Sequence, residues 1–207
     1  MSDLPQIPAP SVMPRRKPGL GFRILPFVPI VVALATALAV RQFHKPAAPV
    51  INNELLGAKA PDFTLRDAHK EEGEAGVTLS LMVEKGPVLM VFFRGYYCER
   101  CVEHLRAVGD LIEDFTDAGV QVIAISPDTS ANMRDSIHNY GDLPFPLLSD
   151  PEDKLAEAYG LVTGDNVYHG VFLVDQNRRI QFAAKTEAPY SDIKSLLETG
   201  KKLKQAE

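Results

Sequence analysis

Apolar runs and amphipathic stretches alternate from residue 60 onward, which is the pattern of a layered α/β domain. Residues 88–93 are a continuous apolar run, and residues 120–125 are apolar apart from Gln121, as expected of strands that are buried on both faces of a sheet. Between them, apolar residues recur at helical spacing until Gly119, which is typical of a helix end; they are Cys98, Cys101, Leu105, Val108, Ile112 and Phe115. Two buried strands joined by a helix are therefore expected.

Shorter patterned segments extend this order. Further strands are expected at 62–65 and 77–82, and further helices at 130–140, with Ser130 as a possible N-cap, and at 152–159. Residues 171–174 and 180–184 flank a turn and predict a hairpin, after which Ser191 can cap a final helix. This order of elements predicts a central mixed β-sheet flanked by helices.

The N-terminal part of the chain has a different pattern. A run without charged residues begins at Ile24 and ends at Val40, and its 17 residues are at the short end of what crosses a bilayer. A membrane anchor is the favoured interpretation, and a cleaved signal peptide is the alternative. The predicted organisation is a cytoplasmic disordered tail at 1–23, a transmembrane helix at 24–41, a linker at 42–54 and the α/β domain at 55–207.

Charge gives this anchor a direction. Four basic residues precede the apolar run, and residues 1–45 hold six basic residues against the single acid Asp3. The positive-inside rule therefore places the N-terminus in the cytoplasm and the main domain outside it, in the periplasm if the source is bacterial. The rest of the chain carries the acidic excess behind the net charge of −5, which argues against nucleic acid as a partner.

The only two cysteines in the chain, Cys98 and Cys101, follow the first buried run directly. Thiols at this spacing, where a strand turns into a helix, can make and break one short-range disulfide. The unpaired N–H groups at the helix start favour a thiolate, and so do Arg94 and Arg100, whereas Glu99 opposes it. The pattern predicts thiol redox chemistry.

Two other uses of the cysteines remain open. A disulfide that closes so short a loop removes little chain entropy, so a purely structural bridge is poorly placed. The C-x-x-C spacing also supplies half of a zinc site, but the chain has no second cysteine pair, and His104 and His169 are the candidate additional ligands. No metal and no cofactor are predicted.

Several motifs together resemble one family. Five segments are similar to segments of the alkyl hydroperoxide reductase and thiol-specific antioxidant (AhpC/TSA) family, the peroxiredoxins. They are residues 57–65 (GAKAPDFTL), 122–128 (VIAISPD), 143–150 (LPFPLLSD), 158–160 (AYG) and 170–175 (GVFLVD). The resemblance covers about residues 55–205 and implies a thioredoxin-like fold. It agrees with the element order predicted from the pattern.

The active-site segment departs from the peroxiredoxin pattern. The family's peroxide-reacting cysteine aligns with Cys101, and the Thr or Ser that stands three residues before it aligns with Cys98. The Pro that comes earlier in the family's pattern aligns with Arg94. The Arg that usually precedes the late strand of the family is replaced by His169. The segment RGYYCERC (94–101) instead resembles the C-x-x-C branch of these redoxins and thioredoxin, in which an aromatic residue, here Tyr97, precedes the first cysteine. Thioredoxins carry a cis-proline opposite the thiols, and the equivalent place in this sequence corresponds to Gly170, or to His169 beside it.

These observations predict a membrane-anchored thiol-disulfide oxidoreductase with an antioxidant or disulfide-reducing role. Cys98 is expected to attack and Cys101 to resolve, with Arg94, Tyr97, Arg100 and His169 as possible modulators. Expected substrates are protein disulfides or hydroperoxides, and a thiol electron donor is required. The alternatives are a thiol-dependent peroxidase, in which Cys101 meets peroxide first, and a non-enzymatic module that uses the thiols for metal handling or binding.

Overall fold

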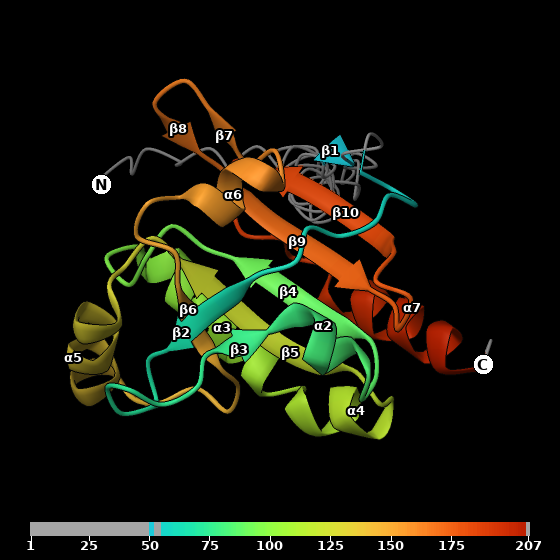
Figure 1. The fold of residues 1–207 in the computed structure, drawn as a ribbon, viewed down its shortest axis with the longest axis horizontal. Helices are drawn as coiled ribbons and strands as arrows, with labels where there is room; N and C mark the ends of the chain where they lie inside the picture. Colours follow the sequence, from blue (N-terminus) through green and yellow to red (C-terminus); the bar gives the residue numbers. More distant parts are fainter. Residues whose placement is uncertain (1–49, 52–54, 206–207) are drawn as a thin grey trace, which may run out of the picture. The chain divides into compact units, whose positions relative to one another are not determined.

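The structure, a computed structural model, describes residues 50–51 and 55–205. Eight strands of this part form one sheet in the order β1-β10-β9-β4-β5-β6-β2-β3 (Figure 1). They are β1 Val50–Ile51, β2 Thr64–Asp67, β3 Val77–Thr78, β4 Val88–Phe92, β5 Gln121–Ser126, β6 Leu147–Ser149, β9 His169–Val174 and β10 Ile180–Thr186. Strands β4, β5 and β6 are parallel to one another, and β9 pairs with β4 antiparallel. The predicted mixed sheet is confirmed.

Helices cover both faces of this sheet. They are α2 Leu79–Val83, α3 Glu99–Gly109, α4 Ile112–Asp117, α5 Ser130–Tyr140, α6 Lys154–Ala158 and α7 Ile193–Gln205. In Figure 1, α2 and α6 lie in front of the sheet, whereas α3 and α7 lie behind it. A small hairpin, β7 Val162–Thr163 and β8 Asn166–Val167, projects from the domain.

The central strand β4 explains why the sheet has two cores. All five of its residues are buried, and successive side chains point to opposite faces. Leu89 and Val91 join the core beneath α3, α4, α5 and α7. Val88, Met90 and Phe92 join the core beneath α2 and α6. The continuous apolar run predicted as a doubly buried strand is therefore such a strand.

Three predicted elements differ in type or extent. The strand expected at 62–65 is β2, which lies two residues later at Thr64–Asp67. The single helix expected from Cys98 to Phe115 is two helices, because α3 ends at Gly109, a weak helix former, and a new helix starts at Ile112. The strand expected at 77–82 is a strand for only two residues and then becomes α2. The helix is stabilised because its buried Leu79 and Val83, four residues apart, pack together into the core.

Both predicted caps are displaced by one residue. The bounds of α5 agree with the prediction, but its N-cap is Thr129, whose side chain accepts a hydrogen bond from the Asn132 N–H. At the start of α7, the Asp192 carboxylate accepts from the Ser195 N–H at 3.1 Å, so Asp192 performs the role expected of Ser191. Asp and Ser are both good caps, and sequence alone does not choose between neighbours.

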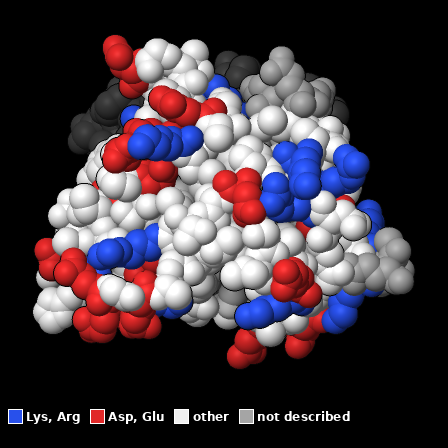
Figure 2. Space-filling view, in the orientation of Figure 1, with Lys and Arg blue, Asp and Glu red and all other residues white. Residues whose placement is uncertain are grey.

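The predicted membrane segment at 24–41 lies outside the described residues, as do the tail and most of the linker. Among the residues that the structure describes, no helix is long and apolar enough to cross a bilayer. On the face drawn in Figure 2, acidic and basic side chains occur in small interspersed groups with uncharged surface between them.

The sheet topology brings two distant segments together. Because β9 is antiparallel to β4, the end of β4 lies beside the start of β9, with Phe92 opposite Gly170. The cysteine-containing segment follows β4, and His169 is the first residue of β9. The cysteine segment and His169, about 70 positions apart in the sequence, therefore lie side by side at the end of β4.

Candidate active site

Cys98 and Cys101 form a disulfide at the start of α3, with their Cα atoms 5.2 Å apart. Cys98 is the N-cap residue, and its carbonyl oxygen accepts hydrogen bonds from the N–H groups of Cys101 and Val102 at 2.9 and 3.1 Å. Cys101 is the third residue of α3 and lies in its first turn. The expected position of both sulfur atoms at a helix N-terminus is confirmed.

The loop between β4 and α3 has a specific anchor. Gly95 has a φ of 118°, a conformation that suits glycine, and its carbonyl oxygen accepts from the Cys98 N–H at 3.1 Å. The next N–H, of Tyr96, donates to the Asp128 carboxylate at 2.9 Å. Asp128 follows β5, so a neighbouring strand end holds the loop in place.

Sequence reasoning assigned Asp128 no role beyond its place at a strand end. Asp128 is the last residue of the segment 122–128 that is similar to the AhpC/TSA family. Only the parallel pairing of β4 with β5 shows that its side chain reaches the cysteine loop. Its own position is fixed by two further hydrogen bonds, from its N–H to Ser126 Oγ and from Ser149 Oγ to its carbonyl oxygen.

The two cysteines differ in accessibility. Cys101 is completely buried, whereas Cys98 is half-buried. Tyr97, next to Cys98, is 76% exposed and presents an aromatic ring to solvent. A bulky disulfide substrate can therefore approach Cys98 but not Cys101.

His169 is the group in contact with the buried thiol position. Its Nε2 lies 3.1 Å from Cys101 Sγ, and the residue is only 4% exposed. His169 points to the same face as Val171 and Leu173, two and four residues further along β9, and α3 covers that face. The position opposite the thiols implied by the resemblance is therefore occupied by His169.

The surroundings of His169 favour a neutral imidazole. Burial, followed by the charges of Arg94 and His104, lowers the pKa of His169 to about 4, although backbone groups of Glu187 and Thr186 act in the opposite direction. Nδ1 makes no hydrogen bond of good geometry. A neutral ring beside Cys101 can accept a hydrogen bond from the reduced thiol through Nε2, and its low pKa makes it a weak base.

Among the described residues, the side chains of Arg94, Arg100 and the neighbouring Tyr96 make no hydrogen bond with either cysteine side chain. Arg94 and Arg100 are exposed, so solvent weakens their influence on the thiols. Tyr96 is buried, and its ring packs edge-on against Phe93 with centroids 5.8 Å apart. Burial, with smaller contributions from Asp142 and Asp128, raises the pKa of Tyr96 to about 12, so its role is packing.

His104 does not join the cysteines. It is half-buried on α3, and burial lowers its pKa. Cys98, Cys101 and His169 are the residues whose ligand atoms lie within 4.8 Å of one another. Of the two histidines considered as metal ligands, the structure therefore brings only His169 to the thiols.

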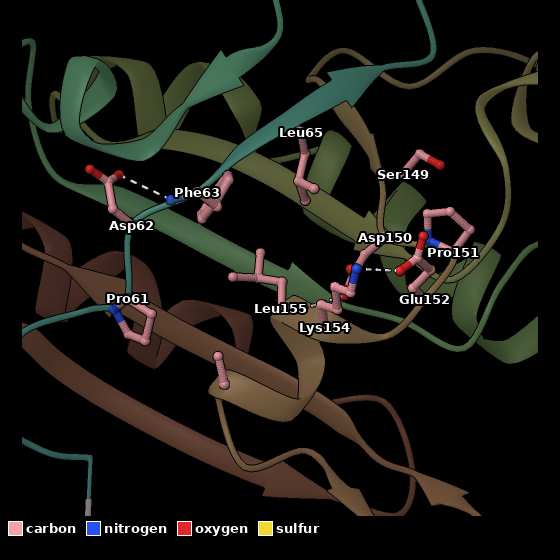
Figure 3. A pocket seen from close by; sticks show the side chains of 11 residues that line it. Pro61, Asp62, Phe63, Leu65, Ser149, Asp150, Pro151, Glu152, Lys154 and Leu155 are labelled. Atoms are coloured by element: carbon pink, nitrogen blue, oxygen red, sulfur yellow. Dashed lines mark hydrogen bonds and ion pairs between the residues drawn. The ribbon is translucent and has the colours of Figure 1, made fainter.

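A separate hollow of about 340 Å³ lies between β2 and α6 (Figure 3). Its lining includes Pro61, Phe63, Leu65, Asp150 and Leu155. Neither cysteine and no histidine lines it, so it contributes nothing to thiol chemistry. The redox site is instead the disulfide with its adjoining His169.

Comparison with known proteins identifies the family. The AhpC/TSA family model matches residues 56–183, more than half of the chain. This chain belongs to the AhpC/TSA family. The resemblance found in the sequence motifs is confirmed, and the matches indicate a thiol peroxidase or oxidoreductase enzyme.

Relatives of two kinds are similar to this AhpC/TSA member. A peroxiredoxin of Thermoplasma volcanium is 32% identical over 136 residues, which are 62% of this chain and 64% of that protein. Peroxiredoxin Q of Sedum lineare is 30% identical over 67% of this chain and 76% of its own length. The thiol-disulfide oxidoreductase ResA of Oceanobacillus iheyensis is 29% identical over 50% of this chain and 53% of that protein. The matches thus span less than two thirds of several relatives.

Solved structures show the same fold. Peroxidoxin BcpB from Mycobacterium tuberculosis superposes with a TM-score of 0.61 at 20% identity, covering 73% of this chain and 96% of that one. The reduced 2-Cys peroxiredoxin of Plasmodium vivax gives a TM-score of 0.64 at 19% identity, over 70% and 80% of the two chains. The predicted thioredoxin-like α/β fold is confirmed.

Proposed function

We propose that this protein is a membrane-anchored thiol-disulfide oxidoreductase in which Cys98 is the attacking thiolate and Cys101 the resolving thiol. The observation that carries this proposal is the unequal burial of the linked pair, with Cys98 half-buried and Cys101 completely buried against His169. The similarity to ResA, whose name states this activity, supports it.

The reaction proceeds by two exchanges. The Cys98 thiolate attacks one sulfur of a substrate disulfide, forms a mixed disulfide and releases the other substrate sulfur as a thiolate. The Cys101 thiol then donates a hydrogen bond to His169 Nε2, attacks Cys98 Sγ and expels the second substrate thiolate, which takes up the Cys101 proton. The substrate gains two electrons, and the protein is left with the Cys98–Cys101 disulfide. An external dithiol returns the protein to its reduced form.

The surroundings of Cys98 suit a protein substrate. The exposed ring of Tyr97 provides apolar surface directly beside the accessible sulfur. Arg94 and Arg100 are exposed near the same helix start and provide positive charge that favours the thiolate. These three residues are proposed to modulate the approach of the substrate and the state of Cys98.

The anchor and the location are proposed from sequence. The apolar run from Ile24 to Val40 is preceded by four basic residues, which supports a helix that crosses the membrane with its N-terminus in the cytoplasm. The redox domain is then extracytoplasmic, where protein disulfides are stable enough to serve as substrates.

A thiol-dependent peroxidase is the second candidate, because several relatives are named peroxiredoxins. In that reaction the Cys101 thiolate attacks a peroxide oxygen and becomes a sulfenic acid, while the alcohol or water leaves. Cys98 then attacks the sulfenic acid, releases water and forms the same disulfide. A hydroperoxide is small enough to be considered for the buried Cys101, unlike a protein disulfide.

Stopped-flow kinetics on the reduced full chain distinguish the two reactions. Two results together support the oxidoreductase proposal: the reduced protein exchanges with a protein disulfide, and its thiols are not oxidised by stoichiometric hydrogen peroxide. Cys101→Ser should then trap a mixed disulfide through Cys98, and Cys98→Ser should lose turnover. Full reductase activity in Cys98→Ser would overturn the assignment. Rapid peroxide loss, with a sulfenic acid on Cys101 in Cys98→Ser, would establish the peroxidase instead, and inertness to both would reject both.

A further inference from the structure

The three side chains at the redox site form a set of soft metal ligands. Sγ of Cys98, Sγ of Cys101 and Nε2 of His169 all lie within 4.8 Å of one another. In the part of the chain that the structure describes, no other group of three or more His, Cys, Asp or Glu ligand atoms has this arrangement. We propose that the reduced protein binds a thiophilic d¹⁰ metal ion, Zn²⁺ or Cu⁺, through these three atoms.

The donor set selects the class of ion. Two thiolates and an imidazole suit Zn²⁺ and Cu⁺, whereas Mg²⁺ and Ca²⁺ require oxygen ligands. Around zinc, sulfur lies at about 2.3 Å and imidazole nitrogen at about 2.0–2.1 Å, so neighbouring ligand atoms are roughly 3.5–3.8 Å apart. His169 Nε2 is already 3.1 Å from Cys101 Sγ, and reduction frees the two sulfur atoms to separate. Only small movements are needed to admit the ion.

The site is held by rigid elements on two sides. The cysteines lie on the first turn of α3, and their backbone is fixed by hydrogen bonds to the carbonyl oxygens of Gly95 and Cys98. His169 begins β9, which is paired with β10 on one side and with β4 on the other. A site on paired strands and a helix start loses little entropy when it binds an ion.

Burial leaves one side of the site open. Cys101 and His169 are buried, but Cys98 is half-buried. Three protein ligands with an open fourth position resemble an exchangeable zinc site more than a closed structural one. The positive charge of Arg94 acts on His169 and opposes a cation, whereas the two thiolates contribute two negative charges. The net charge of the ligand set therefore favours binding.

Metal binding and disulfide formation exclude each other because they use the same sulfur atoms. Binding of one Zn²⁺ to the dithiol forms two Zn–S bonds and one Zn–N bond and releases the two thiol protons to solvent, with no change in oxidation state. The disulfide form has no thiolate to offer. The metal should thus bind only the reduced protein and should protect it from oxidation.

The first test uses the reduced full chain under anaerobic conditions, with a chromophoric chelator competing for Zn²⁺ in one arm and for Cu⁺ in the other. We expect one ion per chain and at least about tenfold weaker binding in His169→Gln. His104→Gln is the matched control, since it makes the same change on α3 outside the three-ligand group. Equal affinity of wild type and folded His169→Gln for both ions would overturn the proposal.

A second measurement needs no variant. X-ray absorption of the loaded wild-type protein should show two sulfur atoms and one imidazole nitrogen around the ion, and the oxidised wild-type protein should bind none. A sulfur-only shell, or equal binding by the oxidised protein, would overturn the proposal even if His169→Gln failed to fold. Neither result bears on disulfide exchange, which is measured without metal.

Discussion

Removal of the Asp128 carboxylate should loosen the cysteine loop while leaving the thiols intact. Oδ2 of Asp128 accepts the Tyr96 N–H at 2.9 Å, and Tyr96 is buried. In Asp128→Ala this N–H loses its partner. The backbone hydrogen bonds of residue 128 with Ser126 and Ser149 can remain, so the change is confined to the loop contact.

The structure gives the size of this effect. A hydrogen bond to a charged group contributes about 1.5–3 kcal/mol, and a buried donor left without a partner costs a similar amount. Because Asp128 is half-buried, we expect the lower part of this range, about 1.5–2 kcal/mol. At about 2–4 °C per kcal/mol for a domain of this size, the melting temperature should fall by about 3–8 °C.

Two variants control this experiment. Asp128→Asn keeps an acceptor oxygen and should recover most of the lost stability. Asp175→Ala removes comparable bonds, from the Arg179 N–H at 2.8 Å and from Gln181 Nε2 at 2.7 Å, at the opposite end of β9 from the site. It should lower stability without slowing disulfide exchange.

The assay pairs thermal unfolding, followed by circular dichroism, with the rate of exchange between the reduced protein and a disulfide. We expect Asp128→Ala to lower both the melting temperature and the exchange rate, and Asp175→Ala to lower only the melting temperature. An Asp128→Ala protein that melts with the wild type would refute the reasoning, because the hydrogen bond would then contribute nothing. Loss of stability with an unchanged exchange rate would reject the positioning role.

Two further predictions concern the sheet beside the site and the dependence of stability on pH. In Gly170→Ala the added Cβ would lie 2.5 Å from Leu161 Cδ1. Chemical denaturation should therefore show that the free energy of unfolding falls by about 1–3 kcal/mol, and a second change, Leu161→Ala, should partly restore it. An unchanged denaturation midpoint in the single variant would contradict this prediction. Burial acts to lower the pKa of His69, but hydrogen bonds and charge from Asp142 and Asp67 outweigh it and raise the pKa. The stability that protonated His69 contributes to the folded protein is therefore present below the pKa of the unfolded state and is lost as pH rises through the pKa of the folded state. Urea unfolding should therefore show His69→Gln losing more stability at about pH 5.5 than at about pH 8.5, and an equal loss at both would exclude this linkage.

The fold was predictable where the physical signal is local and repeated. The buried strands β4 and β5 follow from apolar runs and the helix α5 from a cap residue at its start, because burial on two faces and helix capping each leave a local mark on the sequence. The short strands β1, β7 and β8 leave no such mark, since two residues contain no period. The residues 79–83 form a helix because of tertiary packing, which overrides weak local preference.

The site, too, has a part that the sequence predicted and a part that it did not. The cysteine pair is local, so its spacing was sufficient to predict a disulfide at a helix start. The contact of Cys101 with His169 depends on the pairing of β4 with β9, and motif resemblance, not periodicity, indicated it. The anchor from Asp128 depends on the pairing of β4 with β5 and was missed. Residues that act across strands become visible only when the strand order is known.

The position of His169 links the redox and metal proposals to one feature of the topology. An antiparallel β9 beside β4 brings a strand start, with its fixed backbone, against the helix start that holds the thiols. In the two proposals, the buried imidazole at that point accepts a hydrogen bond from the Cys101 thiol during disulfide formation and donates a lone pair to a metal ion when both thiols are reduced. Both proposed roles begin from the reduced cysteines and use the same Cys101 sulfur atom. A bound metal ion should therefore slow disulfide formation, and the rate of thiol oxidation with and without added Zn²⁺ tests the two roles together.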